Sequence, residues 1–100
     1  MADLHTVNKS PFEKSSLETA IKCSLAGSSI LLIEDGVFAA TTGTSAAEKI
    51  KNASGVSFAV LGPDLQARGL EGKLADGIKV VDYEGFVNLV AESDSVQAWL

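Results

Sequence analysis

The chain has 100 residues, 46% of them hydrophobic, and a formal net charge of -5. This length suits one domain with a modest core, and its eight Lys and Arg residues are too scattered to form a phosphate-binding surface. A single cysteine excludes an internal disulfide, and no apolar run approaches the roughly 20 residues that cross a bilayer. We therefore expect one cytoplasmic domain over residues 1–100, with no membrane and no direct nucleic-acid contact.

The first predicted strand is DLHTV at 3–7, and it ends in turn residues that run to Pro11. A helix follows, because Ser15 and Glu18 have the spacing of a capping box, in which each side chain bonds to the other's backbone. Gly27 is expected to end this helix.

Two apolar runs, ILLI at 30–33 and VSFAVLG at 56–62, are too short for helices and are typical of strands buried on both faces. Between them, GVFAATTG at 36–43 predicts a short helical stretch. A second capping box, Ser45 with Glu48, then predicts a helix.

The second half of the chain repeats this alternation. PDLQARG at 63–69 predicts a short helix and IKVV at 78–81 a fourth strand. Asp82 is expected to cap a last helix, whose inward stripe is predicted from its apolar residues: Phe86, Val87, Leu89 and Val90. Strands that alternate with helices in this way favour a parallel sheet covered on both faces.

Cys23 is the one candidate nucleophile or persulfide carrier. The inward face of its helix is predicted from four residues: Leu17, Ile21, Ser24 and Leu25. Cys23 lies about 130° from the centre of that face, so its thiol should be accessible. It falls in the last helical turn, where the helix dipole disfavours a thiolate, and this favours an unactivated cysteine over a catalytic one.

Four acidic residues follow predicted strands: Glu34, Asp35, Asp64 and Asp82. Such carboxylates could hold Mg²⁺ in a phosphoacceptor domain. Each aspartate also precedes or opens a helix, so we favour helix capping and expect no metal or cofactor. His5 is expected to be a buried, hydrogen-bonded histidine rather than a general base, since no nucleophile stands beside it in sequence.

Five stretches, in this order and spacing, resemble the DsrH/TusB family of sulfur-relay proteins: LHTVNKSPFE, LLIEDGVFAA, LGPDLQARGL, VVDYEGFVNLV and VQAWL. The resemblance covers most of the chain. It implies a three-layer α/β/α fold with a five-stranded, mainly parallel sheet, in which VQAWL is the fifth strand and lies beside the first.

The resemblance also implies a role. Similar proteins are the smallest subunit of a cytoplasmic heterohexamer with two larger related subunits, DsrE/TusD-like and DsrF/TusC-like. The largest subunit receives a persulfide, which passes to a separate DsrC/TusE-like acceptor. The two outputs are 2-thiolation of the tRNA wobble uridine and sulfur oxidation through a reverse dissimilatory sulfite reductase system; NKSPFE and DSVQAWL resemble the second branch more closely.

Family members with a thiol in the first helix carry it where this chain has Ala20, so Cys23 is expected to be at most a minor persulfide site. Two other hypotheses remain: a Mg²⁺-binding phosphoacceptor that uses Asp35, and a purely structural subunit.

The two ends of the chain are expected to form one docking surface if VQAWL pairs with the first strand. Its residues are His5, Pro11, Phe12 and Trp99. Large aromatic residues often anchor interfaces. The alternative is that Trp99 folds back onto its own sheet.

Overall fold

The computed structural model describes residues 3–10, 16–24, 26–53 and 55–99. Its strands are β1 (Asp3–Val7), β2 (Ser29–Leu32), β3 (Ser57–Leu61), β4 (Lys79–Val81) and β5 (Ser95–Trp99). Its helices are α1 (Ser16–Cys23), α2 (Ser45–Asn52), α3 (Gly62–Ala67) and α4 (Tyr83–Glu92), with 3₁₀ helices η1 (Glu34–Ala40) and η2 (Glu71–Lys73).

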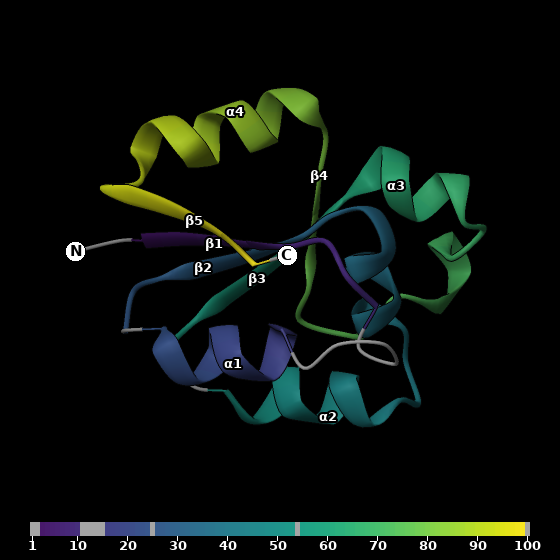
Figure 1. The fold of residues 1–100 in the computed structure, drawn as a ribbon. Coiled ribbons are helices and arrows are strands. Elements are labelled where there is room, and N and C mark those ends of the chain that lie inside the picture. Colours follow the sequence, from purple (N-terminus) through teal and green to yellow (C-terminus); the bar gives the residue numbers. More distant parts are fainter. Residues whose placement is uncertain (1–2, 11–15, 25, 54, 100) are drawn as a thin grey trace.

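The strands form one parallel sheet in the order β4-β3-β2-β1-β5. Figure 1 shows α1 and α2 on one face of this sheet and α4 on the other, while α3 lies beyond the ends of the strands. The predicted three-layer α/β/α fold is confirmed. So is the position of the last strand, because β5 pairs in parallel with β1, Leu4 beside Val96 and Val7 beside Trp99.

The two faces of the sheet carry cores of different size. On the side of α1 and α2, which we call the two-helix face, the described residues form a buried cluster of 15 that extends into η1 and α3. Both helices contribute to it, with Leu17 and Ala20 from α1 and Ala46 and Ile50 from α2. The apolar residues on this face of the sheet are therefore covered by helices of the same chain.

On the side of α4, which we call the one-helix face, the described residues form a smaller buried apolar cluster of five, all from strands: Leu4, Leu31, Ala59, Leu61 and Val81. Every residue of α4 is described, and none is buried. Phe86 and Leu89 pack onto the sheet but remain half-buried. The predicted inward stripe of α4 is therefore wrong for Val87 and Val90, which are 65% and 40% exposed.

The ends of the sheet depend on a tight turn after β2. The Ile33 N–H donates to the carbonyl of Val7 at 3.0 Å, and a Cβ on Gly36 would stand 2.1 Å from the same oxygen. Only glycine fits so close to another backbone. Glu34, between them, has a φ of +48°, a conformation that costs a non-glycine residue energy.

One predicted helix start is shifted by a residue. The N-cap of α2 is Thr44 rather than Ser45, since the Thr44 Oγ1 accepts a hydrogen bond from the Ala47 N–H at 3.1 Å. The predicted cap Ser15 lies outside the described residues. Among the helices of the described ranges, none combines the length and the apolar character needed to cross a membrane.

Candidate functional site

Cys23 is the last residue of α1 and is exposed, as its position on the helical wheel predicts. In the described part of the chain, no side chain is hydrogen-bonded to its sulfur and no cation pairs with it. The helix presents its carboxyl end, which opposes a negative charge on the thiol. Cys23 therefore has access to solvent, and none of the described residues would activate it.

Ala20, three residues earlier, has a different environment. Its side chain is fully buried in the core of the two-helix face. A thiol at position 20 would be enclosed by the protein, whereas the thiol at position 23 meets solvent. The two positions are not interchangeable sites for sulfur chemistry.

His5 and Trp99 meet across the β1–β5 pair, on the two-helix face of the sheet. The indole Nε1–H of Trp99 donates a hydrogen bond to Nδ1 of His5 at 3.1 Å, and the ring centroids are 6.1 Å apart. His5 is only 5% exposed, so the prediction of a buried, hydrogen-bonded histidine is confirmed. Sequence analysis did not anticipate this bond, because its two partners are 94 positions apart.

This hydrogen bond fixes the tautomer of a neutral His5. An indole N–H can only donate, so Nδ1 acts as the acceptor and the ring proton resides on Nε2. Nε2 is buried and has no hydrogen-bond partner among the described residues. His5 thus stabilises the end of β5 and has no lone pair directed at a nucleophile.

Trp99 is the last residue of β5 and lies partly in the core. It is partly buried and packs against the core of the two-helix face, so it does fold back onto its own sheet. The remaining exposed part of the indole lies at the edge of the sheet. Pro11 and Phe12, the other predicted docking residues, lie outside the described residues.

The acidic residues after the strands are held by neighbours. Asp82 caps α4, as predicted, and accepts from the Gly85 N–H at 2.8 Å. Asp64 and Asp35 are not caps, which corrects the capping explanation for both. Asp64 accepts from the Glu34 N–H at 2.7 Å, and Asp35 forms an ion pair with Arg68 at 3.0 Å.

These contacts explain the strained turn after β2. The carboxylate of Asp64 holds the backbone of Glu34 in its left-handed conformation and so joins α3 to the end of β2. Among the described residues, no group of three or more His, Cys, Asp or Glu side chains is arranged to hold a metal ion. The acidic cluster therefore has a structural explanation in contacts between loops.

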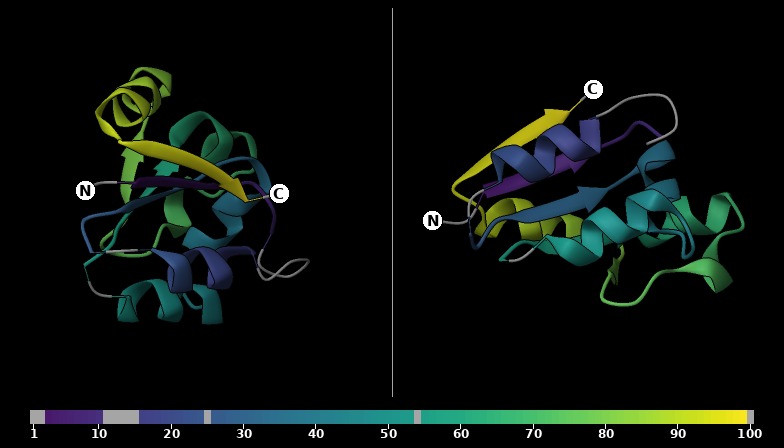
Figure 2. Two further views of the ribbon diagram at one scale, coloured as in Figure 1. Left: turned by 60° about the vertical axis from the view of Figure 1, so that its left-hand side comes forward. Right: turned by 90° about the horizontal axis from the view of Figure 1, so that it is seen from below.

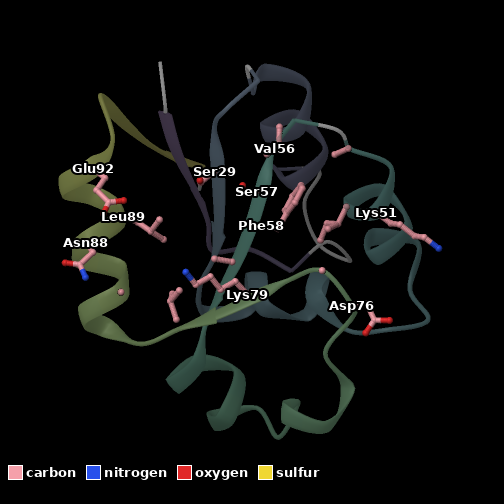
Figure 3. Close-up of a pocket in the computed structure, with 16 residues that line it drawn as sticks. Ser29, Lys51, Val56, Ser57, Phe58, Asp76, Lys79, Asn88, Leu89 and Glu92 are labelled. Carbon is pink, nitrogen blue, oxygen red and sulfur yellow. The ribbon is translucent and has the colours of Figure 1, made fainter.

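A hollow of about 800 Å³ lies along β4 and the start of β3, and Figure 3 shows its lining. Lys79 points into it from β4, while Asn88 and Glu92 border it from α4. Neither Cys23 nor His5 is part of the lining. The hollow is therefore separate from the cysteine and the histidine considered above.

The sequence profile of the family described as "DsrH like protein" matches residues 9–96. The chain belongs to the DsrH family. Protein TusB of Pectobacterium parmentieri is 34% identical over 96 residues, which are 96% of this chain and 99% of that protein. Protein TusB of Escherichia coli K12 is 35% identical with the same coverage.

Solved structures similar to this DsrH-family chain share its fold at low identity. The ychN protein from E. coli has a TM-score of 0.80 at 19% identity, covering 98% of this chain and 99% of that one. A protein from Methanobacterium thermoautotrophicum has a TM-score of 0.72 at 18% identity and covers 96% of each chain. These likenesses support the three-layer architecture.

Proposed function

We propose that this chain is the small subunit of a cytoplasmic sulfur-relay complex. In such a complex a thiolate attacks the outer sulfur of a persulfide, the sulfur–sulfur bond breaks, and the donor leaves as a thiolate. This chain assembles with two larger related subunits, and a cysteine on the largest of them carries the sulfur to a DsrC/TusE-like acceptor. The observation that carries the proposal is the family match over residues 9–96.

The geometry supports an accessory role. Cys23 is exposed but has no cation or base among the described residues, and His5 is buried with its Nδ1 engaged by Trp99. A complete site for nucleophilic catalysis would need a nucleophile within hydrogen-bonding distance of a base. Cys23 is therefore at most a minor persulfide site in this proposal.

The proposed docking role of the chain ends rests on Trp99. Its partly exposed indole stands at the sheet edge and is held in place by His5, so it is a rigid aromatic group of the kind that anchors interfaces. His5, being buried, acts through Trp99. Trp99→Ala should weaken association with the larger subunits by about 2 kcal/mol.

Of the two outputs, the full-length similarity to TusB proteins supports 2-thiolation of the tRNA wobble uridine. The test is deletion of the gene in its own host, followed by measurement of 2-thiouridine in total tRNA and of sulfur oxidation. Loss of 2-thiouridine supports this output. Loss of sulfur oxidation alone would show that the chain acts in sulfur oxidation instead. If both are unchanged, the sulfur-relay proposal is wrong.

A complementation experiment tests the accessory role. The deletion strain receives wild-type protein or Cys23→Ser, with Ser24→Ala as the matched control in the same helical turn. We expect Cys23→Ser to restore at least about half of the lost product, because the main sulfur carrier is on another subunit. Complete failure of Cys23→Ser, with normal protein level, would make Cys23 an essential carrier.

A further inference from the structure

Strand β5 is the least enclosed strand of the sheet. Figure 2 shows it at the outer edge, beside β1, which is the strand that pairs with it. None of its five residues is buried, and Trp99 at its end is partly buried against the core of the two-helix face. The attachment of β5 to the domain therefore depends on main-chain pairing with β1 and on side-chain contacts near the ends of the strand.

Side-chain hydrogen bonds join β5 to β1 at both ends of β5. At its start, the Ser95 Oγ donates to the carboxylate of Asp3 at 2.8 Å, and this bond is exposed to solvent. At its end, the Trp99 Nε1–H donates to Nδ1 of His5 at 3.1 Å. His5 is only 5% exposed, so water does not readily replace the second bond. In both bonds, β1 supplies an acceptor that can take up a proton.

Protonation of His5 would turn Nδ1 from an acceptor into a donor. A histidine that carries a charge has an N–H group at both ring nitrogens, and an indole N–H can only donate. The Nδ1–H of His5 would then face the N–H of Trp99, and the hydrogen bond between them could not form. Nε2 offers no compensation, because it is buried without a hydrogen-bond partner among the described residues.

The charged groups around His5 do not replace the lost bond. The neighbouring strands, β2 over Ser29–Leu32 and β5 over Ser95–Trp99, carry no titratable side chain. On β1, Asp3 shares the face of His5, and its carboxylate accepts from β5. Helix α1 packs against β1 and β5, and its titratable residues are Glu18, which is in an ion pair with α2, and the exposed Lys22 and Cys23. A charge on a buried ring that is neither paired nor hydrogen-bonded costs free energy.

We propose that protonation of His5 releases β5 from the edge of the sheet. The charged ring loses its bond to Trp99 and gains water only if the end of β5 moves away, so β5 opens locally while β1 to β4 stay paired. Neutral His5 holds the strand, and this hold is lost as the pH falls from about 8 to about 5, the range in which histidine changes charge. Release would also remove Trp99 as an anchor for the larger subunits, and this consequence alone rests on the proposed function.

Amide hydrogen exchange of the full chain, measured by NMR across this pH range and corrected for the intrinsic exchange rates, tests the proposal. We expect the protection of β5 amides to fall at least about tenfold relative to that of β2 and β3, as the loss of one buried hydrogen bond would cause. The chain has one histidine and one tryptophan, so the imidazole and indole signals are assigned directly. The loss of protection should follow the titration of the imidazole signal.

Two variants separate the charge of His5 from the hydrogen bond. His5→Asn is the matched control, because the asparagine Oδ1 stands where Nδ1 stands in histidine and can accept from the indole without titrating. Its β5 amides should keep their protection as the pH falls. Trp99→Phe removes the donor, so its β5 amides should be less protected at every pH, with a further fall on acidification of less than about threefold.

Circular dichroism at each pH checks that both variants are folded. The proposal is overturned if the protection of β5 in the wild-type chain falls no more than that of β2 and β3. The same holds if His5→Asn loses as much protection as the wild type or, should that chain not fold, if Trp99→Phe does. A loss that does not follow the imidazole titration assigns the release to another group, such as Asp3, and excludes His5.

Discussion

The two faces of the sheet differ in how completely the chain covers them. On the two-helix face, α1 and α2 each bury two residues and the cluster continues into η1 and α3. On the one-helix face, α4 buries none of its ten residues and Val87 is 65% exposed. Both faces are apolar at the strands, so the difference arises from the number of helices and from where they lie.

This contrast separates two uses of apolar residues in one small domain. The two-helix face stabilises the fold, since its side chains are removed from water by the chain itself. The apolar side chains of α4 and β5 gain little in the isolated chain, and exposed apolar patches on a small protein commonly mark an interaction surface. Substitutions on the two faces should therefore affect different measurements.

The largest difference is expected between two helix leucines. Leu17→Ala in α1 removes a buried side chain and should lower the free energy of unfolding by about 3 kcal/mol. Leu89→Ala in α4 removes a half-buried one and should cost about 1 kcal/mol. Urea unfolding of dilute protein measures both. Equal losses would show that α4 is as well packed as α1.

The next comparison uses two valines. Val60→Ala, at a fully buried position of β3, should cost about 2 kcal/mol. Val87→Ala in α4 should change the stability of the dilute chain by less than about 0.5 kcal/mol, because alanine favours a helix more than valine does. The same unfolding experiment distinguishes them. A large loss of stability for Val87→Ala would mean that the Val87 side chain already packs against another part of the same chain.

A smaller effect is expected where the two-helix face reaches the edge of the sheet. Trp99→Phe removes the N–H that bonds to Nδ1 of His5 and should cost about 1 kcal/mol. A double-mutant cycle with His5→Leu isolates this bond from the loss of packing. Absence of coupling between the two substitutions would show that the hydrogen bond does not hold β5.

The smallest effect concerns the ion pair between Glu18 of α1 and Lys49 of α2, on the two-helix face. The hydrogen bond and charge of Lys49 hold the pKa of the Glu18 carboxyl below its ordinary value. Because the folded-state pKa is lowered, the stabilisation is present above the unfolded-state pKa and is lost as pH falls through the folded-state pKa. Lys49→Ala should raise the pKa of Glu18 in an NMR titration, whereas Lys51→Ala should leave it unchanged.

Much of the fold could be predicted because its signals are local. ILLI and FAVL are short, continuous apolar runs, and both became interior strands. Asp82 was identified as a cap because it directly precedes an apolar helix. The order of β5 beside β1 came from the family resemblance and not from any periodicity in the sequence.

The contacts that were missed join distant parts of the chain. Asp64 accepts a hydrogen bond from the backbone N–H of Glu34, and Asp35 forms an ion pair with Arg68. Neither aspartate therefore caps its own helix. On α4, helical periodicity grouped Val87 and Val90 with Phe86 and Leu89, since apolar spacing identifies a helix but does not say which stripe faces the sheet. The i, i+4, i+7 spacing from Tyr83 was the available signal for a second apolar side.

The position of β5 beside β1 has a consequence for synthesis of the protein. A ribosome delivers β1 first, and β1 can pair with β2 as soon as the segment through β2 has emerged. Its other edge stays open until β5 is made, because Asp3 and Ser95 pair across almost the whole chain. Throughout translation, the growing chain therefore exposes a free strand edge, where a chaperone or a neighbouring nascent chain can bind before the sheet is completed.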